Sequence, residues 1–93
     1  MGIYELVVKR IYELCKEKGI TPNALSYLAG ISQSTVKSIL NGESKNPGIV
    51  TIKKLCDGFN ISIIEFFDTE DFKALEQESK NLSGKYHILQ CQL

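Results

Sequence analysis

The chain has 93 residues, 43% of them apolar, so its length and composition suit one compact domain rather than several. Its 11 basic and 11 acidic residues cancel to a net charge of zero, and without a run of about 18 apolar residues no membrane span is expected. Three cysteines, an odd number, argue against a disulfide framework and favour a reducing cytoplasm. The opening residues lack the small-residue cleavage site of a signal peptide.

Residues 3–18 have the apolar spacing of an amphipathic helix. The expected buried stripe consists of Ile3, Val7, Ile11, Leu14 and Cys15. Gly19 follows directly, and glycine commonly ends a helix because it adopts the left-handed conformation without a steric penalty. We therefore expect the first helix to stop at Gly19.

Residues 21–42 predict two short helices joined by a tight turn. Thr21 is the expected N-cap of the first helix, with Pro22 at the first helical position, where a missing N–H has no cost. Gly30 stands at the turn, and Ser32 is the expected cap of a second helix that stops at the Asn-Gly pair 41–42. The apolar positions predicted to share one core are Leu25, Ala29, Ile31, Val36 and Ile39.

The outward side of this second helix is polar. It carries Gln33, Ser34, Lys37, Ser38 and Asn41. Amides, hydroxyls and a cation on one exposed helix are suited to base edges and phosphates, which indicates a helix-turn-helix. The alternative for each of these residues is an ordinary solvated surface, and Asn41 can also act simply as a helix terminator.

Two further helices are expected downstream. The first spans about residues 50–59, and its inward positions are Ile52, Leu55, Cys56 and Phe59. The second begins at Ser62, with Glu65 three residues later in the spacing of a capping box. The residues expected to close the core are Ile61, Ile64 and Phe67.

The C-terminal segment, residues 68–93, is less regular. Phe72, Leu75 and Leu82 follow helical spacing, which predicts a sixth helix capped by Asp68 or Thr69 and broken at residues 83–84. Residues 85–93 alternate in hydropathy, the pattern of a short strand that needs a partner. Two alternatives follow: the segment forms a homodimer interface, or it is a frayed C-terminus.

Charge is divided unevenly along the chain. Residues 1–64 hold eight basic and five acidic side chains, a net charge of +3, whereas residues 65–93 hold three basic and six acidic ones, a net charge of −3. The basic excess therefore coincides with the two-helix unit. Because a charge of +3 neutralises few phosphates, DNA binding would depend on two subunits acting together.

From Ile11 to Asp68 the chain resembles the phage-repressor (Cro/Xre-type) helix-turn-helix family. The matching features, in order, are a first helix ending in Lys-Gly, a Thr, the small residue and Gly of the turn, an Asn-Gly stop, a Pro-containing loop and two further helices, the last ending in aromatic residues. The resemblance implies an all-α, five-helix, lambda-repressor-like DNA-binding domain. We assign this domain to residues 1–67, with residues 68–93 as an acidic extension for dimerisation or partner binding.

Two departures from the family pattern are informative. Many members pair an Arg in the first helix with a Glu just before the Asn-Gly stop, and here these positions hold Cys15 and Leu40. Replacing both charges avoids a stranded buried charge, so the exchange predicts a contact between Cys15 and Leu40. Pro22 stands where many members have a Gln that binds phosphate, so a phosphate contact from this helix has to come from backbone N–H groups or Asn23.

The resemblance also implies which residues meet DNA. Those expected to read bases are Gln33, Ser34, Lys37 and Ser38. Those expected to bind the sugar-phosphate backbone are Thr21, Asn23, Ser32, Thr35, Asn41, Lys45 and Asn46. A Gln can bond adenine through two atoms, and a Lys can reach guanine or a phosphate.

We therefore expect a sequence-specific transcriptional regulator of double-stranded DNA, a homodimeric repressor located in the cytoplasm at the nucleoid. The alternative is an antitoxin-like protein that binds DNA and also a partner protein through its C-terminal tail. Nothing points to an enzyme, since the sequence has one His, no nucleophile–base pairing and no phosphate-binding Gly loop. His87 and Cys91 are too few ligands for zinc, so no metal, cofactor or membrane partner is expected.

Overall fold

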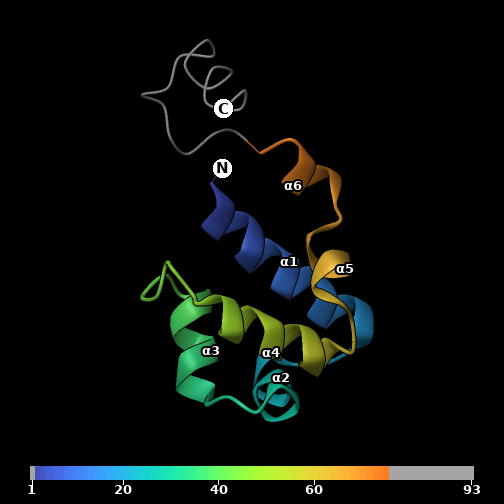
Figure 1. Cartoon of the computed structure of the whole chain (residues 1–93). Coiled ribbons are helices and arrows are strands. Elements are labelled where there is room, and N and C mark those ends of the chain that lie inside the picture. Colours follow the sequence, from blue (N-terminus) through green and yellow to red (C-terminus); the bar gives the residue numbers. More distant parts are fainter. Residues whose placement is uncertain (1, 76–93) are drawn as a thin grey trace, which may run out of the picture.

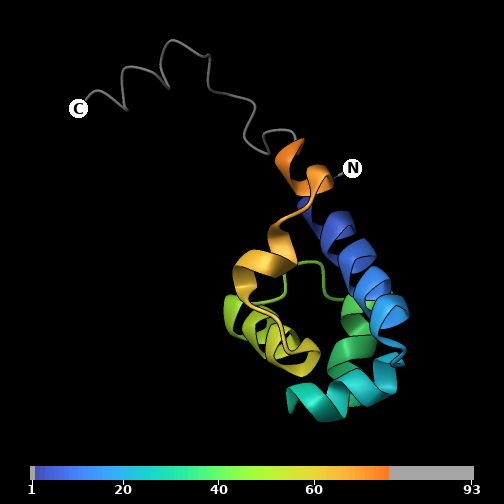
Figure 2. The ribbon, with the colours of Figure 1, turned by 90° about the vertical axis from the view of Figure 1, so that its right-hand side faces the viewer.

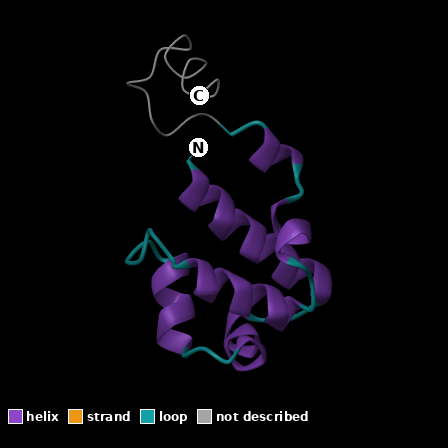
Figure 3. Ribbon diagram, in the orientation of Figure 1, coloured by secondary structure: helices purple, strands orange, loops and turns teal. Residues whose placement is uncertain are grey.

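The computed structural model describes residues 2–75, and helices fill most of that range (Figure 3). The helices are α1 (Ile3–Lys18), α2 (Pro22–Ala29), α3 (Gln33–Leu40), α4 (Ile49–Phe59), α5 (Ile63–Phe67) and α6 (Glu70–Lys73). No strand occurs within residues 2–75, and the predicted all-α fold is confirmed. The sixth helix ends at Lys73, so the prediction that Leu75 lies on it is wrong. The remainder of that predicted helix, residues 76–82, and the strand expected at 85–93 lie outside the described residues. None of the described helices has the length and apolar character that a membrane crossing requires.

The helix boundaries follow from local capping. Thr21 Oγ1 and Ser32 Oγ each accept a hydrogen bond of 3.1 Å from the backbone N–H three residues later, as N-caps of α2 and α3. Gly19 and Gly30 have φ angles of 67° and 68°, so both predicted left-handed helix ends are confirmed. The fourth helix begins one residue earlier than expected, after Gly48.

Three helices, α1, α2 and α5, pack against α4. α2 packs closely against α4, and α3 lies beside α2 (Figures 1 and 2). The close approach depends on Gly58 of α4, where an added Cβ would lie 3.0 Å from the backbone N and 3.2 Å from the Cα of Ala29 in α2. α1 and α5 contact α4, and α6 contacts α1. The α2–α3 unit therefore lies at one end of the domain and α6 at the other (Figure 2).

The core is one cluster drawn from α1 to α5. Its buried members are Val7, Ile11, Leu14, Cys15, Leu25, Ala29, Val36, Ile39, Ile52, Leu55, Cys56, Phe59, Ile61 and Phe66. Every apolar position predicted to face inward in α2, α3 and α4 belongs to this cluster, and Ile31 and Phe67 pack against it. Burial of this surface, at about 25 cal/mol per Å², holds the helices together.

Two core predictions are wrong. Ile64 is 78% exposed, and the fully buried Phe66 takes its place. Because α5 starts at Ile63, its inward face runs through Ile63 and Phe66, three residues apart, and Ile64 falls on the other side. Ile3 is 42% exposed as the first residue of α1, whereas Leu6, which was not predicted, is buried.

The caps of α5 and α6 lie close together in the sequence. Ser62 Oγ accepts a hydrogen bond of 3.0 Å from Glu65 N–H, which confirms this cap. The reciprocal bond of the predicted capping box, from Ser62 N–H to the Glu65 carboxylate, is absent from residues 2–75. Of the two caps considered for the sixth helix, Thr69 is the one used, since its Oγ1 accepts a bond of 3.2 Å from Phe72 N–H.

Two basic residues of α1 hold the last two helices in place. Arg10 Nε donates to Phe66 O at 2.7 Å, and its Nη2 donates to Glu65 O at 2.9 Å. These carbonyls end α5, where partial negative charge favours a cation. Lys9 Nζ lies 2.7 Å from Asp71 Oδ2 of α6, and this hydrogen-bonded pair raises the pKa of Lys9.

Candidate nucleic-acid interface

The solvent-facing side of α3 is polar. Gln33, Ser34 and Lys37 are exposed, and Ser38 is half-buried. On the inner side Val36 and Ile39 are only 3% and 2% exposed, so packing decides which face of the helix meets solvent. The four residues predicted to read bases therefore lie on successive turns outside the core.

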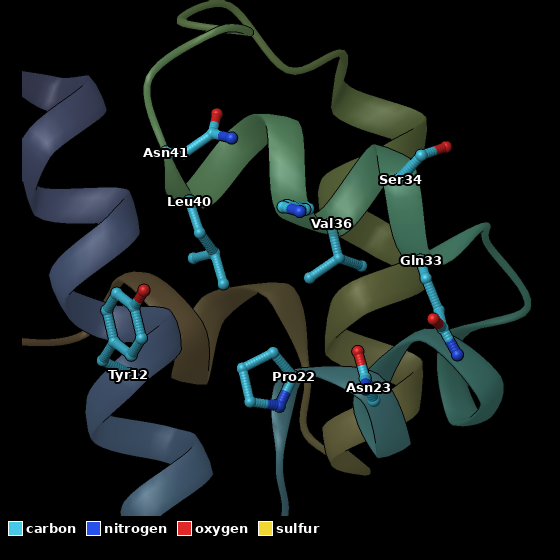
Figure 4. Close-up of a pocket in the computed structure, with 9 residues that line it drawn as sticks. Tyr12, Pro22, Asn23, Gln33, Ser34, Val36, Leu40 and Asn41 are labelled. Carbon is cyan, nitrogen blue, oxygen red and sulfur yellow. The ribbon is translucent and has the colours of Figure 1, made fainter.

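A hollow of about 600 Å³ lies between α3, α1 and the start of α2 (Figure 4). We call it the α1–α3 hollow, and its lining residues are Tyr12, Pro22, Asn23, Gln33, Ser34, Val36, Lys37, Leu40 and Asn41. In Figure 4 the apolar side chains of Val36 and Leu40 point inward from α3 towards Pro22. No lining residue is acidic and Lys37 is a cation, so the polar rim suits an anionic group.

A smaller hollow of about 240 Å³ lies between α3, the 41–48 loop and the start of α4. We call it the hydroxyl hollow, because its polar lining consists of Ser34, Thr35, Ser38, Ser44 and Thr51. Hydroxyl groups donate hydrogen bonds to phosphate oxygens. α3 thus has a hollow free of acidic lining on each side.

Hydroxyl groups order the first turn of α3. Ser32 Oγ lies 2.8 Å from Thr35 Oγ1 and 3.1 Å from Ser34 Oγ, in addition to its capping bond. The two hydroxyls of Ser32 and Thr35, both predicted to bind the DNA backbone, therefore also hold the start of the helix. The Gln33 amide makes no hydrogen bond within residues 2–75, which leaves its oxygen and nitrogen available to a base edge.

Asn41 is engaged at the end of α3. Its Nδ2 donates to Glu43 Oε1 at 2.7 Å, and its Oδ1 accepts from Glu43 N–H at 3.1 Å. These bonds occupy both ends of the amide and bring a carboxylate close to the α1–α3 hollow. A phosphate contact from Asn41 therefore requires Glu43 to release it.

Two predicted backbone-binding residues lie further away. Lys45 and Asn46 line a third hollow, shared with Tyr4 of α1 and Ile49 of α4. Neither lines the α1–α3 hollow or the hydroxyl hollow. The structure thus brings Asn23, but not these loop residues, into one hollow with the polar face of α3.

The start of α2 offers few hydrogen-bond donors. Pro22 has no N–H, Ala24 N–H donates to Thr21 Oγ1, and Leu25 N–H donates to Thr21 O. The N–H of Asn23 has no partner within the described residues. The phosphate contact expected from α2 would therefore come from Asn23, through its backbone N–H and its side chain.

Fewer cations are available than the charge count suggests. Lys9 and Arg10 are bonded to α6 and α5, and Lys53 pairs with Asp57 one turn later in α4. The basic residues of 1–64 that make no such bond within the described residues are Lys16, Lys18, Lys37, Lys45 and Lys54. Of these, Lys37 alone lines a hollow beside α3.

The family model described as the Cro/C1-type helix-turn-helix DNA-binding domain matches residues 10–71, more than half of the chain. The chain belongs to this family. The predicted resemblance to phage repressors is therefore confirmed, and the family is one of DNA-binding transcription regulators rather than of enzymes.

Individual relatives agree with this assignment. The HTH-type transcriptional regulator SlrR of Bacillus subtilis (strain 168) is 27% identical over 82 residues, which are 88% of this chain and 53% of SlrR, so the chain spans about half the length of that relative. The crystal structure of the prophage Lp1 protein 11 matches with a TM-score of 0.71 and 37% identity, over 81% of this chain and 100% of that one. A chain of the SinR protein/SinI protein complex matches with a TM-score of 0.61 and 26% identity, over 92% of this chain and 93% of that one.

Two tyrosines of α1 were missed by the sequence analysis of this DNA-binding domain. Tyr12 lines the α1–α3 hollow, and Tyr4 donates a hydrogen bond of 2.5 Å to Ile39 O in α3. The sequence held a partial indication that Tyr12 lies near the core face of α1, because this residue directly follows the buried Ile11. Its place beside α3 depends on how α1 packs, which spacing within one helix does not reveal.

The cysteines of the described residues are core side chains, as predicted. Burial raises the pKa of the Cys15 and Cys56 thiols. Cys15 belongs to the core cluster and Leu40 packs against that cluster, while their direct contact stays a prediction. Within residues 2–75 no three His, Cys, Asp or Glu side chains gather as a metal site would require, and His87 and Cys91 lie outside that range.

Proposed function

We propose that the domain is a sequence-specific regulator of transcription, a dimeric repressor that inserts α3 into the major groove of double-stranded DNA. The observation that carries this proposal is the exposed polar face of α3 between two hollows, neither of them lined by an acidic residue. A B-DNA major groove admits one α-helix and has a phosphate backbone along each edge. The two hollows are suited to those two edges.

The proposed base-reading residues are Gln33 and Ser34 in the first turn of α3, with Lys37 and Ser38 one turn later. The Gln33 amide pairs with N6 and N7 of an adenine, because both of its polar atoms are unoccupied within the described residues. Lys37 reaches guanine O6 and N7 or a phosphate, and the two hydroxyls bond either donors or acceptors.

The proposed backbone contacts come from the surroundings of α3. They are Thr21, Asn23, Ser32, Thr35, Asn41, Lys45 and Asn46. Asn23 is supported by its open N–H at the start of α2, and Thr35 by its position in the hydroxyl hollow. Asn41 contributes only after its bonds to Glu43 break.

The scarcity of free cations near α3 supports binding as a dimer. One subunit neutralises few phosphates, whereas two subunits on half-sites one helical turn apart double the number of contacts. We propose residues 1–67 as the DNA-binding domain and the acidic segment 68–93, most of it outside the described residues, as the dimerisation or partner-binding part. Binding to chromosomal DNA would place the protein in the cytoplasm, at the nucleoid.

A second candidate is an antitoxin-like protein that binds DNA through α3 and a partner protein through its C-terminal tail. The likeness to a chain of the SinR protein/SinI protein complex supports a protein partner. An adjacent gene for a small toxin-like protein would favour this candidate over a simple repressor. In both cases the chain acts by binding, and we propose no catalytic activity.

Selection of bound sites from random double-stranded DNA tests the proposal. The expected result is a palindrome with half-sites about 10 bp apart. Gln33→Ala should remove discrimination at one base pair and leave non-specific binding nearly intact, because phosphate contacts carry no sequence information. Equal weakening on every sequence would contradict the role of Gln33, and absent or salt-independent binding would contradict the DNA function itself.

Matched lysine variants separate the surface of α3 from general charge. Lys37→Ala and Lys54→Ala remove the same charge, but Lys54 lies on α4 and lines neither hollow beside α3. Lys37→Ala should weaken binding to the selected site much more than Lys54→Ala. Equal effects of the two variants would show that Lys37 acts only through net charge.

A further inference from the structure

Tyr12 is a polar residue of α1 in the rim of the α1–α3 hollow. Its side chain is half exposed, at 50%, and it lines the hollow with Asn23 of α2 and Gln33 of α3. Figure 4 shows the ring on α1 with its hydroxyl directed towards the α3 side of the hollow. Within residues 2–75 this hydroxyl has no hydrogen-bond partner.

The other two tyrosines of the described residues each lack at least one of these features. The Tyr4 hydroxyl is occupied, because it donates to Ile39 O at 2.5 Å. Tyr27 is 79% exposed with an open hydroxyl, but it lines none of the hollows beside α3. Tyr12 alone among the three combines an open hydroxyl with a place next to the proposed reading helix.

The wall of the hollow formed by α1 and α2 is short of donors. Pro22 supplies none, and Asn23 supplies the one open N–H of the first turn of α2. No acidic residue lines the hollow itself, and the nearby Glu43 carboxylate is bonded to Asn41 on the α3 side. The Tyr12 hydroxyl therefore adds a donor to a wall that otherwise has only those of Asn23.

We infer that the Tyr12 hydroxyl donates a hydrogen bond to a DNA phosphate at the α1 wall of this hollow, next to the phosphate bound by Asn23 or to the same one. The inference rests on the proposed function, since it assumes that α3 occupies the major groove. It extends the DNA contact surface to α1, which the sequence analysis left entirely to the scaffold.

A neutral donor has a signature that a lysine lacks. A hydrogen bond to phosphate strengthens binding to every sequence alike, because phosphates carry no base identity. The phenol adds no positive charge, so it releases no counterion and leaves the slope of log K against log salt unchanged. Affinity and salt slope together therefore distinguish Tyr12 from a cationic contact and from a base-reading residue.

The test measures the affinity of the full chain for a fluorescent duplex that carries its selected site, and for a scrambled duplex, over a range of salt concentrations. Tyr12→Phe removes only the hydroxyl and should weaken binding to both duplexes about tenfold, with the salt slope and the melting temperature unchanged. Tyr27→Phe is the matched control and should change nothing. Tyr12→Lys should recover the lost affinity and steepen the salt slope by about one unit.

Each outcome decides the inference. Equal affinity of Tyr12→Phe and wild type overturns it while the proposed function stands. Loss confined to the selected site also overturns it, because a phosphate contact acts on all sequences. A fall in melting temperature that accounts for the lost binding assigns Tyr12 to the scaffold instead. If the wild-type chain binds no double-stranded DNA, both the inference and the proposed function fail.

Discussion

Arg10→Met is the substitution that most directly tests how α5 is held in the domain. The guanidinium of Arg10 spans two carbonyls at the end of α5, with Nε–O and Nη2–O distances of 2.7 and 2.9 Å. Methionine keeps an unbranched apolar stem over the same stretch of α1 but removes both donors. The change therefore isolates the two hydrogen bonds from the packing of the side chain.

The expected loss follows from the surroundings of each bond. Hydrogen bonds from charged donors contribute about 1.5–3 kcal/mol each, and this value falls where water competes. The bond to Phe66 O is partly buried and the bond to Glu65 O is exposed, so we expect a total near the lower end, about 2 kcal/mol. For a domain of this size, such a loss lowers the melting temperature by roughly 8–16 °C.

Urea and thermal unfolding followed by circular dichroism provide the assay. Lys9→Met is the control, because Lys9 is the adjacent cation of α1 and its partner Asp71 is half exposed. This surface pair should contribute far less than the two bonds of Arg10. Equal losses for the two variants, or an unchanged melting temperature for Arg10→Met, would refute the reasoning. The folded Arg10→Met protein should keep its DNA affinity, since the guanidinium is engaged at α5.

Three further outcomes are expected. Gly58→Ala should lower the melting temperature, because the added Cβ would lie 3.0 Å from the backbone N of Ala29. This clash should outweigh the preference of alanine for a helix, about 1 kcal/mol. An increase in melting temperature would show that α2 moves aside without cost. Glu43→Gln should strengthen binding to DNA of any sequence in a titration at low salt, with a smaller gain at high salt, since it removes the negative charge beside Asn41. Unchanged affinity would mean that Glu43 lies away from the phosphates. Cys56 should resist iodoacetamide in the native protein, because its thiol is fully buried and burial raises its pKa. It should react after unfolding in urea, as followed by peptide mass mapping. Rapid labelling of the native protein would contradict its position in the core.

Most helix boundaries were predictable because they depend on neighbouring residues. Thr21 and Ser32 cap their helices through hydrogen bonds that reach only three residues along the chain, and Gly30 ends α2 through its own backbone angle. The register of α5 was not predictable in the same way. Ile64 is a large apolar residue of the kind found in cores, but a helix of about one turn is too short for its sequence to show which side faces inward.

The candidate site also has one part that depends on neighbouring residues and one part that depends on tertiary packing. That α3 carries Gln33, Ser34 and Lys37 on its outer face follows from local spacing against Val36 and Ile39, so the sequence alone identified this polar face and the family to which it belongs. The proposed roles of these residues in DNA binding stay predictions.

Tertiary packing decided which groups surround that face. It brings Tyr12 from α1 into the rim of the α1–α3 hollow, and it withdraws Lys9 and Arg10 by bonding them to α6 and α5. The residues that meet in these places are ten or more positions apart in the chain, and only the packing of the helices brings them together. Helix caps and apolar periodicity depend on residues close together in the sequence. The groups that surround the outer face of α3 depend instead on the arrangement of the whole domain.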